Sequence, residues 1–262
     1  MKKDLNIPTA SPNRNIFEMR IVVAIFIFSL KIVNGDVERN QDANAKRAQH
    51  DVVKGRQHWQ GESVCRPTSA DVLGPYYLPY PPARQQLCDR DPDFPQLTGL
   101  LVVGRLRAED CTPLEGAKLE LWQADHRGHY IIREHCRGFI RSGKGGYYSF
   151  LTIHPGKYKV REGYRPAHIH FRVELEGYDT LVTQMYFEGD PNLGRNDSCT
   201  ACSSDKSDLV VETYRMCPDD TGDFCFDMGH FDITLRRGHG ADVIPDVDDE
   251  EAELMDMVHE GK

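Results

Sequence analysis

Residues 167–174 read Ala-His-Ile-His-Phe-Arg-Val-Glu, and this stretch says most about the fold. The run is rich in β-branched and aromatic residues, and Gly163 and Pro166 interrupt the chain just before it, which is typical of a β-strand. Because side chains alternate faces along a strand, His168 and His170 share one face while Ile169 points to the other. Two imidazoles on one face form a candidate metal-binding pair, although this pattern alone is a weak signal.

Similar runs recur between Gly74 and Leu235, separated by Gly, Pro, Asp and Asn. Many short strands joined by turns, without a convincing helical stripe, indicate an all-β, antiparallel β-sandwich with long loops. We expect this catalytic or binding domain to occupy residues 70–240. The expected strands are 100–106, 118–123, 146–151, 158–161, 167–174, 181–187 and 230–235.

The amino-terminal region differs from this body. Residues 21–30 form an uncharged apolar run, which is too short to span a bilayer because a spanning helix needs about 20 apolar residues. The run is typical of a signal-peptide core. We expect a signal peptide at 1–35, a polar leader at 36–69, and a secreted, extracellular protein without stable membrane association after cleavage. The alternatives are a start at Met19, an uncleaved anchor and a buried core strand.

Charge is concentrated at the other end. The chain of 262 residues has a formal net charge of −9, which argues against general nucleic-acid binding. Nine carboxylates and one lysine lie between Asp242 and Lys262, so the rest of the chain is nearly neutral. We expect residues 241–262 to be a solvated acidic tail.

The chain has eight cysteines. An even number behind an expected export signal indicates a framework of disulfides that staples the fold. The pairing stays open, because eight cysteines allow 105 connectivities. The alternative is a zinc site built on Cys199-x-x-Cys202 with Cys217 and Cys225, in which only the first pair has tight ligand spacing. A glycosylation sequon at Asn196 adds a weak indication of secretion.

Several motifs, in order along the chain, carry a resemblance to a known family. The motifs are Gly74-Pro75-Tyr76-Tyr77, residues 121–130 (LWQADHRGHY), 146–158 (GYYSFLTIHPGKY), 165–171 (RPAHIHF) and 183–187 (TQMYF). This series is similar to the signatures of the intradiol ring-cleavage dioxygenases, and it covers about residues 70–190 and the closing strand to Leu235. The cysteine-rich, exported form resembles the secreted single-domain enzymes of plant-feeding mites.

The resemblance implies that Tyr130, Tyr158, His168 and His170 hold one non-haem Fe(III). The donor chemistry agrees, since two phenolates and two imidazoles without a thiolate suit a hard trivalent ion. A free phenol has a pKa of about 10, so only a strongly charged metal would keep it ionised at neutral pH.

The resemblance also implies roles for other residues. Tyr158 would act as a base for the hydroxyl protons of a chelating catechol, and Arg165 would place positive charge beside the activated ring. Gln184 would act close to these groups, and Tyr76 and Tyr77 would line the substrate pocket. With O₂ as co-substrate, the ring would open between its hydroxylated carbons to give a muconate-type diacid.

Further expectations concern assembly and substrate. The segment before the sandwich is too short and polar to supply the helical dimerisation segment of bacterial relatives, so we expect a monomer acting on plant-derived catechols. One competing hypothesis is a non-catalytic secreted β-sandwich that binds a metal or small aromatics. Another is a zinc hydrolase that adds His135, His154 or Asp125 to the histidine pair.

Overall fold

The computed structural model describes residues 64–238, apart from 92, 94–96, 131–134, 161–162 and 218–224. The predicted signal peptide, most of the leader and the acidic tail lie outside these residues. Within them the chain forms strands and two short 3-10 helices but no α-helix, which confirms the all-β class. The elements are β1 (Gly99–Ala108), β2 (Lys118–Gln123), β3 (Arg137–Arg141), η2 (Lys144–Gly146), β4 (Tyr147–Ile153), β5 (Tyr158–Val160), β6 (Gly163–Arg165), β7 (His168–Glu174), β8 (Leu181–Phe187), η3 (Gly194–Asn196), β9 (Val210–Val211), β10 (Thr213–Met216), β11 (Phe226–His230) and β12 (Ile233–Leu235).

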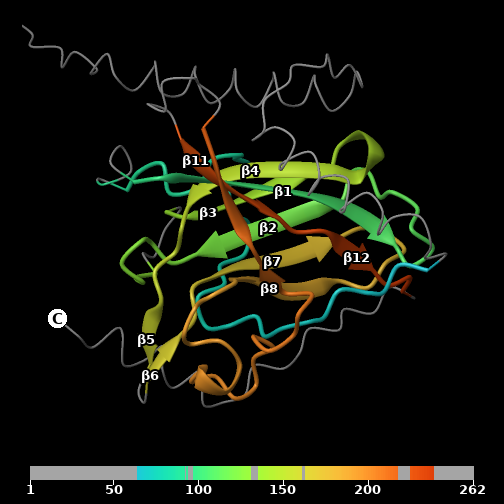
Figure 1. Cartoon of the computed structure of the whole chain (residues 1–262). Helices are drawn as coiled ribbons and strands as arrows, with labels where there is room; N and C mark the ends of the chain where they lie inside the picture. The colour runs from blue at the N-terminus through green and yellow to red at the C-terminus, as the bar shows by residue number, and fades with distance from the viewer. Residues whose placement is uncertain are drawn as a thin grey trace, which may run out of the picture. The chain divides into compact units, whose positions relative to one another are not determined.

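The strands form two five-stranded sheets and a separate two-stranded ribbon (Figure 1). One sheet has the order β3-β2-β7-β8-β9, and the other has the order β10-β11-β1-β12 with β4 also paired to β1. Most neighbours are antiparallel, as expected, but β1 runs parallel to β11 and β12, and β8 runs parallel to β9. The sheets are therefore mixed.

The core lies between the two sheets and is centred on Phe171 of β7. The Phe171 ring is 5.9 Å from that of Phe150 on β4 and 5.1 Å from that of Phe231, between β11 and β12. Ile169 and Val173 share the Phe171 side of β7 and are fully buried. Since side chains alternate along a strand, the histidines of β7 lie on its opposite face, outside this core.

All eight cysteines are paired, so the expected disulfide framework is confirmed. The zinc alternative is wrong, because its four proposed ligands are bonded to one another in two disulfides. The pairs are Cys65–Cys111, Cys88–Cys136, Cys199–Cys202 and Cys217–Cys225.

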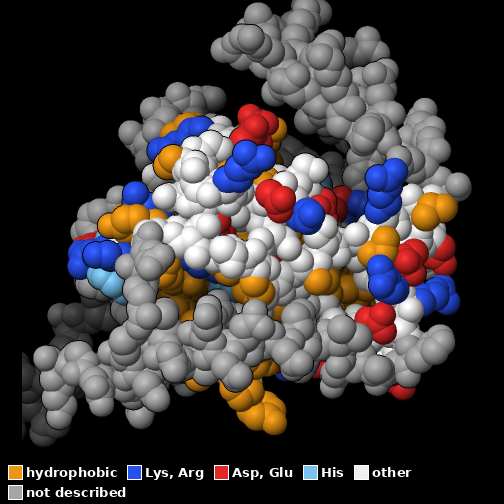
Figure 2. Space-filling view, turned by 90° about the horizontal axis from the view of Figure 1, so that it is seen from below, with side chains coloured by type: hydrophobic (Ala, Val, Ile, Leu, Met, Phe, Trp, Pro, Cys, Tyr) orange, Lys and Arg blue, Asp and Glu red, His pale blue; other side chains and the backbone are white. Residues whose placement is uncertain are grey.

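Charges of both signs are interspersed on the face drawn in Figure 2. Such mixing avoids a strong field of one sign on this face. Among the described residues, none of the helices has the length and apolar character required to cross a membrane.

Candidate metal centre

Three of the four predicted metal ligands meet at one point. The Nε2 atoms of His168 and His170 are 3.1 Å apart, and the Tyr130 hydroxyl oxygen is 3.2 Å from His168 Nε2. Both histidines project from the outer face of β7 and are 2% exposed. The alternation of side chains along β7 therefore brings the two imidazoles to one site, as the sequence predicts.

Tyr158, the fourth predicted ligand, borders the same point. Its ring centroid is 5.5 Å from that of Tyr130 and 5.6 Å from that of His168. Tyr158 begins β5 and is the direct cross-strand partner of Arg165 on β6. The β5–β6 ribbon, at the lower left of Figure 1, thus brings a phenol and a guanidinium to the centre together.

Two glycines bring the segments before Tyr130 and Tyr158 into contact. A Cβ atom on Gly128 would lie 2.2 Å from the Lys157 carbonyl oxygen, and one on Gly156 would lie 2.4 Å from the Gly128 nitrogen. Gly128 also has φ of +84°, a conformation that side chains disfavour. Only glycine allows these two backbones to approach so closely.

A hydrogen bond orients the His168 ring, and a ring stack orients the His170 ring. The Nδ1 atom of His168 lies 2.7 Å from the Pro166 carbonyl oxygen, so Nδ1 donates and Nε2 keeps its lone pair. The His170 ring stacks on Trp122 at 4.6 Å and 7°. Burial lowers the pKa of both imidazoles, and the nearby Arg165 lowers it further. Neutral imidazoles with inward-facing lone pairs are the form that binds metal.

The surroundings of Tyr130 disfavour ionisation of its phenol. Burial raises the pKa of Tyr130 well above its ordinary value, the neighbouring Tyr158 raises it further, and Arg165 opposes the rise. Ionising this phenol therefore requires a cation in contact with its oxygen. Two phenols and two neutral imidazoles gathered at one point fit a hard trivalent ion such as ferric iron.

Arg165 lies in a buried polar network behind the centre. Its Nε and Nη2 atoms donate to both carboxylate oxygens of Asp197 at 3.2 and 3.3 Å. Its Nη2 also lies 2.9 Å from the Tyr186 hydroxyl and 3.2 Å from Gln184 Oε1. Burial alone would lower the pKa of Arg165, but the charges of Tyr158, Tyr186 and Asp197 outweigh it and raise the pKa. The guanidinium therefore stays charged.

The amide of Gln184 has polar partners at both its oxygen and its nitrogen. Its oxygen accepts from Arg165 and lies 3.0 Å from the Tyr186 hydroxyl, whose proton is donated to Asp71, and its nitrogen donates to the Val72 carbonyl at 2.9 Å. Gln184 thus connects Arg165 to the backbone at Val72.

The two tyrosines predicted to bind substrate point in different directions. Tyr76 stacks on Tyr130 and meets Tyr158 edge-on at 5.9 Å. The Tyr77 hydroxyl instead donates to Glu120 at 2.7 Å, and its ring lies 5.0 Å from that of Trp122. Tyr76 therefore borders the metal centre, whereas Tyr77 packs beside it.

Arg137 is a second buried arginine near the centre, and sequence reasoning missed it. Arg137, Trp122 and His170 are consecutive cross-strand partners on β3, β2 and β7, so they form one row on the outer face. Arg137 Nη1 donates to the Tyr76 carbonyl at 2.8 Å. The sequence signal, an arginine at the start of a strand, is too common to single it out.

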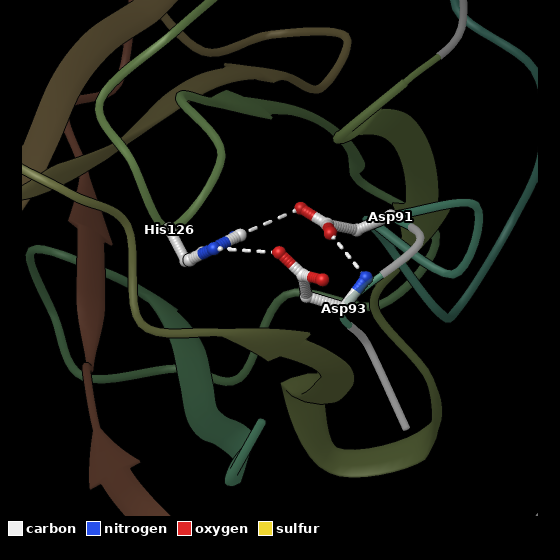
Figure 3. A group of neighbouring side chains, drawn as sticks. All are labelled: Asp91, Asp93 and His126. Atoms are coloured by element: carbon white, nitrogen blue, oxygen red, sulfur yellow. Dashed lines mark hydrogen bonds and ion pairs between the residues drawn. The ribbon is translucent and has the colours of Figure 1, made fainter. Parts of the chain in front are cut away.

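A separate cluster supports the turn that leads to Tyr130 (Figure 3). The two ring nitrogens of His126 lie 3.1 Å from Asp91 Oδ2 and 3.3 Å from Asp93 Oδ2. Arg127 also pairs with Asp93, so this carboxylate already has a protein cation beside it. We interpret the cluster as a set of polar contacts that holds two loops together.

Two of the extra ligands required by the zinc-hydrolase hypothesis are engaged elsewhere. His154 Nε2 lies 3.1 Å from Asp227. Asp125 Oδ1 accepts the backbone N–H groups of Arg127 and His129 at 2.9 and 2.8 Å. These contacts count against His154 and Asp125 as further ligands beside the histidine pair.

Comparisons with known proteins agree with this geometry. Residues 72–237 match the family model described as "Dioxygenase". The chain is 32% identical over 155 residues to a chlorocatechol 1,2-dioxygenase of Rhodococcus opacus, covering 48% of this chain and 58% of that one. It is 35% identical over 113 residues to a 6-chlorohydroxyquinol 1,2-dioxygenase of Cupriavidus pinatubonensis, covering 36% and 41%. The chain thus spans about half the length of these relatives.

The chain is also similar to proteins of known structure. The dioxygenase domain of a carbohydrate-binding fusion protein from Streptomyces sp. SirexAA-E is 30% identical with a TM-score of 0.53, covering 66% of this chain and all of that domain. Catechol 1,2-dioxygenase of Acinetobacter radioresistens is 18% identical with a TM-score of 0.61, covering 92% of each chain, which shows a shared fold. The family model covers more than half of the sequence, and this chain therefore belongs to the intradiol ring-cleavage dioxygenase family.

Proposed function

We propose that the protein is a secreted, monomeric dioxygenase that opens catecholic rings between their two hydroxylated carbons with O₂ and releases muconate-type diacids. Its substrates are plant-derived catechols, and nucleic acid and membranes are not partners. The observation that carries the proposal is the convergence of Tyr130, His168 and His170 at 3.1–3.2 Å with Tyr158 beside them. The four disulfides support secretion, since such bonds persist in oxidising compartments.

Tyr130, Tyr158, His168 and His170 would hold a single ferric ion. Bound there, Fe(III) would withdraw charge from a chelating catechol and so make a ring carbon open to attack by O₂. The Nδ1–H···O bond from His168 to Pro166 keeps the imidazole orientation and tautomer fixed. Both histidines of this donor set and Tyr158 are buried.

Tyr158 and Arg165 supply the proton and charge chemistry. The Tyr158 oxygen would accept a proton from a substrate hydroxyl, which is a role suited to a phenolate. The Arg165 guanidinium carbon lies 6.0 Å from the centre of the Tyr158 ring. Positive charge at this distance stabilises a phenolate and an anionic ring in a site that excludes water.

The proposal is tested on the purified full chain. We expect about one iron per chain by elemental analysis, a red-brown colour from ferric phenolate bonds, and oxygen uptake with a panel of catechols that matches diacid formation by mass spectrometry. Tyr158→Phe should shift the visible band and slow turnover. A colourless protein without iron or oxygen uptake would instead support the non-catalytic binding module.

A further inference from the structure

The carboxylate that pairs with Arg165 belongs to Asp197, which lies just before the short Cys199–Cys202 disulfide. The Arg165 and Asp197 side chains are 2% and 1% exposed, and they form two N–H···O bonds. Two buried partners held by paired hydrogen bonds fix each other's position. Whatever orients Asp197 therefore also orients the guanidinium.

The Cys199–Cys202 disulfide directly follows Asp197. The backbone N–H of Cys199 donates to Asp197 Oδ1 at 3.0 Å, and the N–H of Cys202 donates to the Cys199 carbonyl at 3.3 Å. The disulfide closes this turn across only three residues of sequence separation. One end of the disulfide ring is thus bonded to the counter-ion of Arg165.

The other end of the ring reaches Arg165 by a second route. Ser203 N–H donates to Asp71 Oδ2 at 3.1 Å, and the same oxygen accepts the Tyr186 hydroxyl at 2.7 Å. Arg165 Nη2 in turn donates to the Tyr186 oxygen at 2.9 Å. The residues on both sides of the disulfide therefore connect to one guanidinium.

The loop also packs directly on the strand that carries Arg165. Ser198 N–H donates to the Tyr164 carbonyl at 3.3 Å. A Cβ atom on Gly163 would lie 2.2 Å from Ser198 Oγ. Thr200 and Ala201, which lie between the two cysteines, are exposed, and Cys199 and Cys202 are half-buried. An external thiol can therefore reach the disulfide.

We infer that the Cys199–Cys202 disulfide positions Arg165 through Asp197 and Asp71, and makes turnover sensitive to dithiol reductants. In the exchange, the two thiols of the dithiol form a disulfide as the Cys199–Cys202 bond breaks, and each cysteine sulfur ends as a thiol. The inference rests on the proposed function, because it assigns Arg165 a role in turnover. Asp197 and Asp71 are then positioning residues.

The first test is a comparison of two disulfide deletions. Cys199→Ser/Cys202→Ser should lower kcat roughly tenfold, since small misplacements of an orienting group are costly, while KM, iron content and the visible band change little. The matched control, Cys217→Ser/Cys225→Ser, removes another short disulfide and should leave kcat unchanged. Equal losses in both variants, or loss of iron only in the first, would overturn the inference.

A double-mutant cycle separates positioning from general stability. In an Arg165→Met background, removal of Cys199–Cys202 should cause no further loss of kcat, because the group it positions is gone. An additional tenfold loss in that background would contradict the inference. So would a Cys199–Cys202 deletion that lowers only the free energy of unfolding.

A third measurement does not depend on activity. When the wild-type protein is treated with a dithiol, and alkylation with mass spectrometry shows Cys199–Cys202 open, amide exchange in residues 163–171 should accelerate. Unchanged exchange there would refute the coupling. If the wild-type protein shows no oxygen uptake with any catechol, the proposed function fails, while this exchange result still decides the structural coupling.

Discussion

The rings of Tyr76 and Tyr130 stack face to face, with centroids 4.1 Å apart and an interplanar angle of 9°. A hydrogen bond from the buried Arg137 side chain to the Tyr76 carbonyl holds Tyr76 in this position. One aromatic residue thus covers a predicted metal ligand.

This stack predicts a difference between two Tyr76 variants. Tyr76→Phe keeps the ring and should leave KM for catechol within about twofold, whereas Tyr76→Ala should raise KM about tenfold, because an aromatic pair contributes up to about 1.5 kcal/mol. Steady-state oxygen uptake measures both. Identical KM values for the two variants would show that the ring does not contribute to substrate binding.

Gly128→Ala should abolish iron binding. Its Cβ would lie 2.2 Å from the Lys157 carbonyl oxygen, so the segments leading to Tyr130 and Tyr158 would have to separate. Gly177→Ala is the matched control, because Gly177 has φ of +82° but no atom within 4 Å of its Cβ. We expect Gly177→Ala to lose about 1 kcal/mol of stability from backbone strain alone and to keep its iron, as measured by elemental analysis and urea unfolding.

Arg165→Met should lower kcat by roughly 10²–10³ without loss of iron, since a charged donor beside the reacting group stabilises the transition state by several kcal/mol. The control is Arg172→Met on β7, where the guanidinium pairs with Glu174 at 2.7 Å rather than with the centre. Turnover should be unaffected in that variant. Loss of the visible band in Arg165→Met would instead indicate that the arginine holds the metal site together.

His230 and Asp232 give the stability a pH dependence. The hydrogen bond to Asp232 at 2.8 Å raises the pKa of His230, whose side chain is 58% exposed. Burial raises the pKa of Asp232, but the hydrogen bond and charge of His230, with Arg107, lower it overall. The His230 contribution is fully present below its unfolded pKa of about 6.5 and is lost as the pH rises through the higher folded value.

We therefore expect Asp232→Asn to destabilise the protein more at pH 5.5 than at pH 8.5, by less than about 1 kcal/mol because His230 is largely exposed. The Asp232 contribution is lost only as the pH falls through its lowered pKa, so it is intact at both values. Urea unfolding measures the difference. In a His230→Gln background the extra loss at pH 5.5 should vanish.

Much of the fold followed from local pattern. The bounds predicted for the strands at 118–123 and 181–187 agree with β2 and β8. The parallel pairing of β1 with β11 and β12 was not predictable, since it joins residues such as Leu100 and Asp227 that no local signal relates. The strand at Arg137–Arg141 was missed because glycine and charged residues dilute its pattern.

Some residues of the candidate site could likewise be predicted from the sequence, and others could not. His168 and His170 follow from strand alternation, and the two tyrosines came only from the family resemblance, which the comparisons support. Asp71 and Asp197 could not be found, because each reaches the site across a long stretch of chain; Asp71 bonds to Tyr186 over a separation of 115 residues. Contacts of that kind depend on tertiary packing, which a single sequence does not display.

The position of β1 also bears on how the protein is made. Its partners β11 and β12 leave the ribosome last among the described strands, and closing so long a loop carries an entropic cost that slows folding. Until Ile233–Leu235 emerges, β1 has unpaired backbone groups along an edge. A nascent chain stalled before that point would be prone to pair with another chain and aggregate.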